Sequence, residues 1–205
     1  MFSQYQNKET EAGLDEAGRG ALAGPVVAAA VILPPDYYNE HIDDSKVLTA
    51  KERTIAREII LKDCLAWSVA EISNTEIDRI NVLNATFKAM HKCIEQLKLK
   101  PGFLIIDGNR FKHYKNFPFK CVVDGDANYF SIAAASILAK THRDAMMKKF
   151  AEKFPEYGWE KNMGYGTQFH LKQLQKAGVC SLHRFSFKPV MEAKKGNKQT
   201  KTLLD

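Results

Sequence analysis

Two adjacent carboxylates, Asp15 and Glu16, interrupt an apolar stretch near the start of the chain. Burying a charge costs free energy unless the charge is paired or coordinates a metal ion. A strand that carries both acids toward a core therefore requires a cation. A glycine turn at residues 18–20 follows at once, and a second apolar run, residues 26–33, comes after it.

Two further acids follow apolar runs later in the chain. Asp107 comes directly after residues 103–106, and Asp126 comes shortly after residues 119–123. Ligands gather at the carboxyl ends of parallel strands in open sheets, so the four carboxylates converge if these runs are neighbours. An all-oxygen ligand set suits a hard cation such as Mg²⁺ or Mn²⁺. The alternative is that Asp107 and Asp126 are ordinary turn residues, because Asp is frequent in turns.

The elements that must position these acids alternate between strands and helices. Alternating and fully apolar runs predict five strands, at residues 10–17, 24–33, 65–72, 103–106 and 119–123. Helical periodicity predicts four helices, at about residues 49–63, 74–97, 129–153 and 167–177. Thr49 and Glu52 have the spacing of a capping box, and Asn74 is the expected cap of the second helix. This order of elements predicts an α/β fold.

The composition limits the classes of protein to which the chain can belong. Its 205 residues suffice for one domain with a substantial core. The net charge of +6 fits either a polyanionic partner or a solvated basic surface. The four cysteines are far apart and lack zinc-site spacing. No apolar run reaches the roughly 20 residues of a membrane span, and we see no signal sequence, so we expect a cytoplasmic protein.

Several motifs, taken together and in order, resemble ribonuclease HII. They are Gly13 to Leu33, Asp44-Ser45-Lys46, Ile106-Asp107-Gly108, Gly125-Asp126 followed by Ser131 to Lys140, Arg143-Asp144, Gly164-Tyr165-Gly166-Thr167 and His183-Arg184. The resemblance extends from about residue 10 to about residue 190. Any one of these motifs alone is weak, but their joint order is specific.

The resemblance implies a ribonuclease H-like mixed five-stranded sheet flanked by helices, with a helical C-terminal extension. It implies one catalytic domain over residues 1–190, with the extension starting near residue 156 and a basic, flexible tail at residues 191–205. The implied enzyme is a monomeric endonuclease that cleaves RNA paired with DNA and incises 5′ of single ribonucleotides in duplex DNA. Its products carry 3′-hydroxyl and 5′-phosphate groups, and its role is ribonucleotide removal in replication and repair.

The resemblance also assigns the site. Its metal ligands for Mn²⁺ or Mg²⁺ fall on Asp15, Glu16, Asp107 and Asp126, in a mechanism with two metal ions. Its substrate contacts fall on Gly18, Arg19, Gly20, Ser45, Lys46, Tyr165, His183 and Arg184. The glycine turn would bring backbone amides close to the ribose 2′-hydroxyl. Tyr165 would stack on a sugar or base, and the other four residues would bind phosphates. The plainer alternatives are a simple turn, a loop tyrosine and a solvated lysine.

Four positions depart from the family pattern. Ala21 replaces a proline, and Met163 and Phe185 stand where basic residues are common. Asp124 also replaces a basic residue and adds a fifth carboxylate near the expected metals. If residues 124 and 126 continue a strand, the two acids face the same way; we assign the ligand to Asp126 because it matches the Gly-Asp motif.

Three other functions compete with this interpretation. The related type HIII enzyme is disfavoured because Arg19 stands where that family typically has lysine. A nucleic-acid-binding module without catalytic activity would not need four carboxylates. A different ribonuclease H-like phosphoryl transferase, acting on DNA junctions, would cleave a duplex that contains no ribonucleotide.

Overall fold

The computed structural model describes residues 1–6 and 9–202, with side chains described as far as residue 195. Two compact units share the chain. The sheet unit comprises Met1–Ala17, Val27–Glu71 and Thr86–His142; the helical unit comprises Gly18–Val26, Ile72–Ala85 and Arg143–Asp205. No helix within the described residues is long and apolar enough to cross a membrane.

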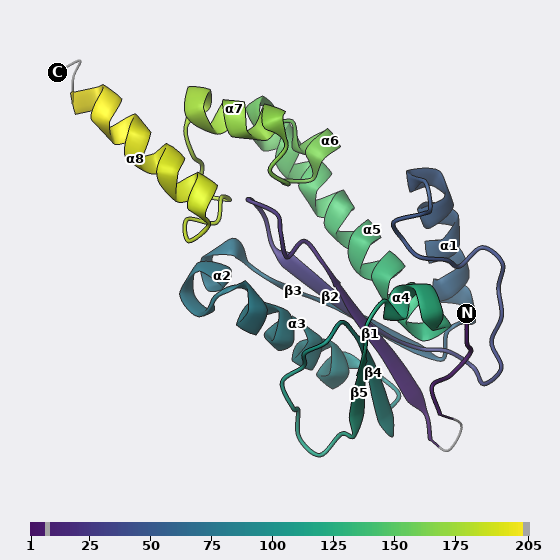
Figure 1. Ribbon diagram of the computed structural model, residues 1–205. Helices are drawn as coiled ribbons and strands as arrows, with labels where there is room; N and C mark the ends of the chain where they lie inside the picture. Colours follow the sequence, from purple (N-terminus) through teal and green to yellow (C-terminus); the bar gives the residue numbers. More distant parts are fainter. Residues whose placement is uncertain (7–8, 203–205) are drawn as a thin grey trace. The chain divides into compact units, whose positions relative to one another are not determined.

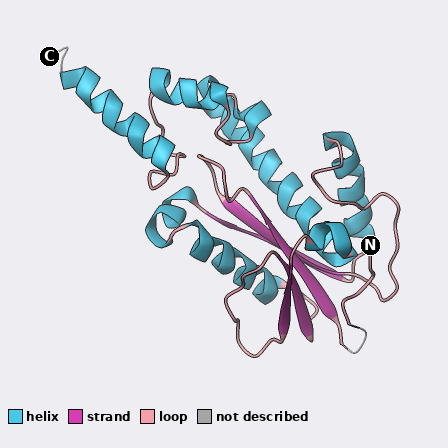
Figure 2. Cartoon of the chain, in the orientation of Figure 1, coloured by secondary structure: helices cyan, strands magenta, loops and turns pink. Residues whose placement is uncertain are grey.

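The five predicted strands form one mixed sheet with the order β3-β2-β1-β4-β5 (Figures 1 and 2). Their bounds are β1 Glu11–Ala17, β2 Val26–Ile32, β3 Ala66–Ile72, β4 Phe103–Asp107 and β5 Phe119–Val122. Strand β1 pairs antiparallel with β2 and parallel with β4, which pairs parallel with β5. Every residue of β2 is buried, which explains its unbroken apolar sequence. The mixed five-stranded α/β prediction is confirmed.

Helices cover both faces of the sheet in the sheet unit. They are α1 Ala50–Asp63, the part of α3 (Val82–Gln96) from Thr86 onward, α4 Gly125–Asn128 and the part of α5 (Phe130–Lys153) up to His142. Figure 1 shows α1 and α5 on one side of the sheet and α3 on the other. The Thr49–Glu52 capping box at the start of α1 is present as predicted. On the opposite side, the thiol of Cys93 in α3 donates a hydrogen bond to the Ala28 carbonyl of β2.

Three details of the predicted elements are wrong. The helix expected over residues 74–97 is two helices, α2 Asn74–Ile80 and α3, because Asn81 between them has a left-handed φ of 63°. The N-cap of α2 is Ser73, whose side chain accepts a hydrogen bond from the Glu76 amide. Asn74, the expected cap, is instead the first residue of the helix. Strand β5, expected to resemble the buried β4, lies at the sheet edge and is only partly buried.

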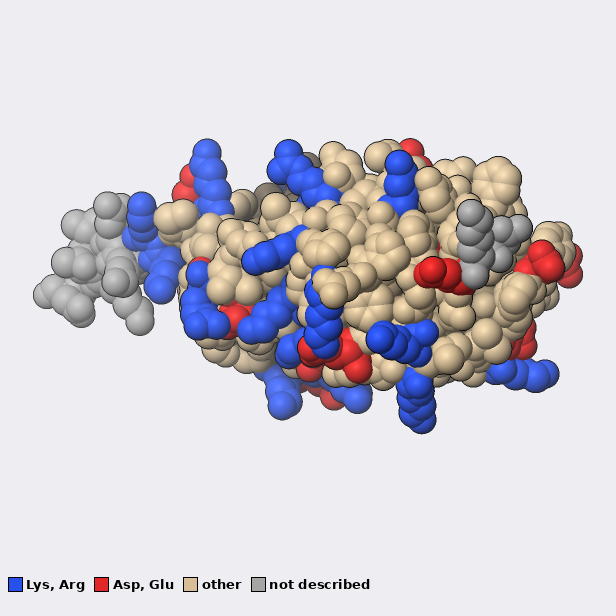
Figure 3. All heavy atoms as spheres, turned by 90° about the horizontal axis from the view of Figure 1, so that it is seen from below, with Lys and Arg blue, Asp and Glu red and all other residues tan. Residues whose placement is uncertain are grey.

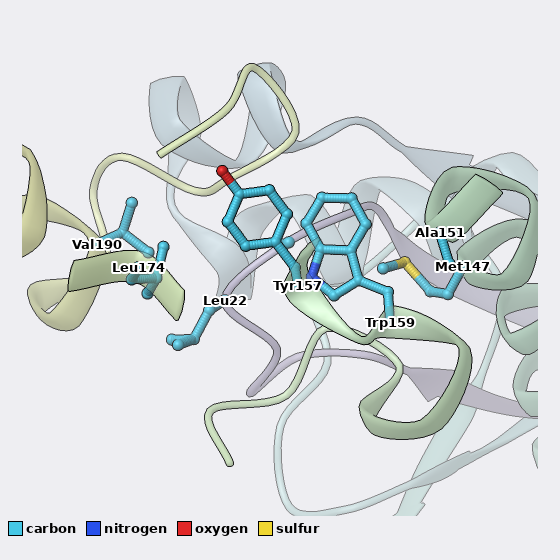
Figure 4. Packing of buried hydrophobic residues seen from close by; sticks show 8 residues of the cluster. Leu22, Met147, Ala151, Tyr157, Trp159, Leu174 and Val190 are labelled. Carbon is cyan, nitrogen blue, oxygen red and sulfur yellow. The ribbon is translucent and has the colours of Figure 1, made fainter. Parts of the chain in front are cut away.

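The helical unit has its own apolar core. Beyond α5 it contains the 3₁₀ helix η1 Pro155–Tyr157, α6 Trp159–Asn162, α7 Gln168–Ala177 and α8 Lys188–Thr202. Helix α7, predicted over residues 167–177, begins after an N-cap at Thr167. Figure 4 shows the rings of Tyr157 and Trp159 side by side, with centroids 5.1 Å apart. Leu22, from the turn after β1, joins this cluster, so the core reaches back to the N-terminal motif.

The C-terminal prediction is met in part. The extension from residue 156 is helical, as expected. Residues 191–202, expected as a separate tail, continue helix α8, and residues 203–205 lie outside the described residues. Flexibility of the tail and the single catalytic domain stay predictions.

A substitution at Gly13 tests the packing of α5 on the sheet. A Cβ atom at Gly13 would lie 2.3 Å from the backbone carbonyl carbon of Ser131 in α5. We expect Gly13→Ala to lower the free energy of unfolding by about 3 kcal/mol or more, because both clashing groups are backbone-anchored. Gly20→Ala is the matched control, since a Cβ there meets nothing within 4 Å. Urea unfolding curves measure both; equal stability of the two variants would contradict this packing.

Candidate active site

The strand register brings Asp15 and Asp107 together at the carboxyl ends of two neighbouring parallel strands. Leu14 pairs with Ile106 in the parallel β1–β4 ladder, so the next residues, Asp15 and Asp107, lie level at the carboxyl ends of these strands. Asp107 is also paired with Val122, the last residue of β5. The convergence expected from the apolar runs therefore follows from parallel pairing.

Asp15 and Asp126 are the two most buried of the four acids. The side chain of Asp15 is 5% exposed and accepts a hydrogen bond from the Ser136 hydroxyl of α5 and from the Glu16 amide, the latter at 2.6 Å. Ser136 in turn is 2.9 Å from the hydroxyl of Ser45, which is 4% exposed. Because Ser136 donates to Asp15, Ser45 donates to Ser136. A chain of two hydroxyls therefore fixes the orientation of Asp15.

Asp107 and Asp126 are held by different donors. The Gly125 amide donates to Asp107 Oδ1 at 2.8 Å. Asp126, 2% exposed in α4, accepts a 2.5 Å hydrogen bond from Lys46 Nζ. Asp124 is exposed and has a left-handed φ of 53° at the start of α4. The chain turns at residue 124, so the two acids do not continue a strand with their side chains on one face, and only Asp126 is buried.

The electrostatics of the cluster call for a cation. Burial, followed by the charges of Glu16 and Asp107, raises the pKa of Asp15 well above its usual value. Burial, followed by the charge of Asp126, raises the pKa of Asp107. Carboxylates that repel one another in a low-dielectric site are stabilised by a positive charge. Their oxygen-only donor set fits Mg²⁺ or Mn²⁺.

The carboxylates do not surround a common point in this conformation. Among the residues that the structure describes, no three acidic, histidine or cysteine side chains are grouped closely enough to hold a metal ion. Protein donors satisfy three of them instead: Ser136 at Asp15, the Gly125 amide at Asp107, and Lys46 at Asp126. In this conformation the protein's own donors, and not a shared cation, are the partners of these three acids.

The glycine turn belongs to the helical unit, where its two glycines have different surroundings. Gly18 is buried with φ 91°, and a Cβ atom there would lie 2.0 Å from Arg143 Nε. Gly20 is exposed and open. Gly18 is therefore needed to seat a guanidinium, whereas Gly20 leaves room for a ligand to approach the backbone. Arg19, between them, is exposed.

Two buried guanidiniums hold this turn from within the helical unit. Arg143 donates to the carbonyls of Ala23, Pro25 and Met163 at 2.8–3.0 Å. Arg184 donates to the carbonyls of Arg19, Gly24 and Pro25 at 2.9–3.0 Å. Burial, then the charge of Arg143, lowers the pKa of Arg184 to about 9. Carbonyl oxygens thus offset the cost of burying two cations.

The Tyr165 loop rests on the same guanidinium. Arg143 Cζ lies 5.4 Å from the centroid of the Tyr165 ring, which is 37% exposed. The Tyr165 carbonyl is 2.9 Å from His170 Nδ1, so this nitrogen carries a proton and donates it. Tyr165 is therefore fixed on both its ring and its backbone, with one side of the ring left accessible.

A histidine network anchors that backbone contact. His170 Nε2 accepts from the Trp159 indole at 3.2 Å, so the neighbouring His183 Nε2, 3.1 Å away, must be the donor of their shared hydrogen bond. His183 Nδ1 then accepts from the Cys180 amide at 3.0 Å. Both imidazoles are neutral in this arrangement. Burial, and then the charge of His170, lowers the pKa of His183 to about 4.

The predicted phosphate contacts separate into two kinds. Ser45, His183 and Arg184 are buried, and protein groups use their polar atoms. In this conformation they position the site and do not face a ligand. Lys46, by contrast, has a side chain that is 72% exposed. Figure 3 shows lysine and arginine side chains standing among acidic and uncharged residues on one face of the molecule.

Sequence patterns left several of these groups without a role. Ser136 and Arg143 lie within the quoted motifs, but the sequence assigned neither residue a role of its own. Trp159 and His170 were assigned no function. Their roles depend on contacts between segments far apart in the chain, such as the 120-residue separation between Arg143 and Ala23.

Comparisons with known proteins identify the family and the fold. A family model described as ribonuclease HII matches residues 12–190. A ribonuclease HII of Cytophaga hutchinsonii is 54% identical over 192 residues, covering 92% of this chain and 95% of that protein. The crystal structure of ribonuclease H2 from Pyrococcus horikoshii superposes with a TM-score of 0.78 at 21% identity, covering 93% of this chain and 99% of that one. A Bst ribonuclease HIII structure in complex with Mn²⁺ has a TM-score of 0.70 at 18% identity, covering 93% and 70%.

Acidification tests the neutral histidine network. Below pH 6.5 the unfolded chain binds a proton at His183 that the folded chain excludes until about pH 4. Stability should therefore fall through this window, by about 3 kcal/mol from this residue. Urea unfolding at several pH values should show a smaller decrease for His183→Gln, whose side chain does not titrate. The same pH dependence in both proteins would contradict a buried neutral His183.

Proposed function

The chain belongs to the ribonuclease HII family, and we propose that its catalytic metal ligands are Asp15, Glu16, Asp107 and Asp126. Members of this family are ribonuclease H endonucleases, which cleave the RNA strand of RNA/DNA hybrids and incise 5′ of single ribonucleotides in duplex DNA, leaving 3′-hydroxyl and 5′-phosphate ends. The parallel register that sets Asp15 beside Asp107 carries the ligand assignment. It gives phosphodiester hydrolysis an anionic centre at the ends of three parallel strands.

The metal would be Mn²⁺ or Mg²⁺. When bound, such ions supply charge stabilisation for the attacking and leaving oxygens of the phosphodiester. The chain's own part is to hold the ligands in place before the metal arrives. Ser136 holds Asp15, and the Gly125 amide holds Asp107, so the protein's own donors orient these two carboxyl groups.

Ribose recognition would lie in the glycine turn and Tyr165. The open space at Gly20 supports an approach of the 2′-hydroxyl to the backbone. The partly exposed ring of Tyr165, fixed by Arg143, supports stacking on the sugar or base. Arg19 and Lys46 are exposed cations that would contact phosphates, which position the duplex without reading its sequence.

Several narrower points belong to the same proposal. The enzyme acts as a monomer in the cytoplasm, on RNA/DNA hybrids and on DNA that contains ribonucleotides. Its role is the removal of those ribonucleotides during replication and repair. Ser45, His183 and Arg184 serve as positioning residues, because their polar atoms are already bonded within the protein.

Replacement of a single ligand tests the metal centre. Asp107→Asn should lower cleavage of a labelled RNA/DNA hybrid in Mn²⁺ by about three orders of magnitude or more, while hybrid binding persists. Asp124→Asn is the matched control and should retain activity, because Asp124 is exposed and outside the cluster. Loss of activity in Asp124→Asn with survival of Asp107→Asn would reverse the assignment. An EDTA-treated sample and an all-DNA duplex test metal dependence and the requirement for ribose.

Truncation of the loop tyrosine tests ribose recognition. Tyr165→Ala should reduce the rate at a single embedded ribonucleotide by about tenfold or more, since one base or sugar stack contributes about 1–3 kcal/mol. Phe169→Ala removes another exposed aromatic ring from the helical unit and should leave the rate within about twofold. Gel assays on a duplex with one ribonucleotide measure both. An unchanged rate for Tyr165→Ala would refute its role.

A further inference from the structure

Lys46 occupies a position at which a metal ion would compete with it. Its Nζ lies 2.5 Å from Asp126 Oδ2 and 3.7 Å from Asp44 Oδ1. The Asp126 side chain is 2% exposed, whereas that of Lys46 is 72% exposed. An accessible cation therefore neutralises one of the least accessible acids of the cluster.

The backbone that carries Lys46 is anchored on both sides. The Ser45 hydroxyl is bonded to Ser136, and Arg53 Nη1 donates to the Ser45 carbonyl at 2.8 Å. The Lys46 amide donates to Asp44 Oδ1 at 2.9 Å. A change at Lys46 thus requires rotation of its own side chain, not movement of the loop. Such rotation is easy for a long side chain that is mostly in solvent.

A carboxylate oxygen that binds a divalent ion cannot also keep an ammonium group at 2.5 Å. The two cations repel each other, and the ion attracts the acid more strongly because it carries twice the charge. The remaining acids reinforce this preference, because Asp107 and Asp126 repel each other and one lysine contacts only one of them.

We propose that Lys46 is an internal counter-ion of Asp126, that a divalent cation displaces it on binding, and that the released ammonium then contacts a substrate phosphate. The inference rests on the proposed function, in which Asp126 is a metal ligand. It gives Lys46 two successive partners, both anionic. It also links metal binding to substrate binding, since the phosphate contact becomes available only after Asp126 has exchanged lysine for metal.

Metal affinity, measured without substrate, tests the displacement. Isothermal titration of the metal-free protein with Mn²⁺ should give a Kd about three- to tenfold tighter for Lys46→Met than for the wild type, because no ion pair must be broken. Lys46→Arg, which keeps the cation, should retain the wild-type value. Lys51→Met, at an exposed lysine in the first turn of α1, removes the same charge and should change Kd by less than about twofold.

Thermal unfolding gives a second readout. The increase in Tm on adding saturating Mn²⁺ should be larger for Lys46→Met, because the ion pair with Asp126 that this variant lacks stabilises only the metal-free state of the wild type. An unchanged or weaker Mn²⁺ affinity in Lys46→Met would overturn the inference and leave the proposed ligands intact. Absence of Mn²⁺ binding by the wild type would instead overturn the metal site itself. The two failures are therefore distinguishable.

Discussion

Repulsion among carboxylates at the ends of parallel strands is the constraint on which the sheet unit depends. Parallel pairing of β1 with β4 sets Asp15 level with Asp107, and the burial of Asp15 limits the screening of its charge by water. Each acid consequently needs a nearby donor, and the surrounding segments supply them. Helix α5 provides Ser136, the turn before Asp126 provides the Gly125 amide, and the loop before α1 provides Lys46. Three separate segments thus each supply a hydrogen-bond donor to one cluster of acids.

The helical unit buries positive charges instead of negative ones. Arg143 and Arg184 are buried cations, and their donors go to backbone carbonyls within the unit rather than to carboxylates. Carbonyl partners satisfy hydrogen bonds without cancelling charge, so burial lowers the pKa of both guanidiniums. The gain is geometric, because two rigid planar groups fix five carbonyls of the turn and the Tyr165 loop through six hydrogen bonds. The residues proposed to read ribose are accordingly held by the core beneath them.

Residue type alone does not show whether a side chain binds a ligand or supports the site. Ser45, His183 and Arg184 belong to classes that often bind phosphate, yet each is bonded inside its own unit. The neutral state of His183 shows why, since Trp159 can only donate and the Tyr165 carbonyl can only accept. These fixed roles determine the protonation of both imidazoles. In this conformation the two neutral imidazoles support the Tyr165 loop.

The sequence by itself determined the elements, their approximate bounds and the identity of the acids, because hydrophobic periodicity and motif spacing are local properties of the chain. The capping box at Thr49 and the strand that carries Asp15 and Glu16 were both readable in this way. The break at Asn81 and the edge position of β5 were not, since a left-handed residue and a strand's neighbours leave no periodic signal. Only the tertiary structure separated Asp124 from Asp126, joined Lys46 to an acid 80 residues away and placed Arg143 against Gly18. Those pairings depend on which distant segments pack together, and packing is decided by the whole chain.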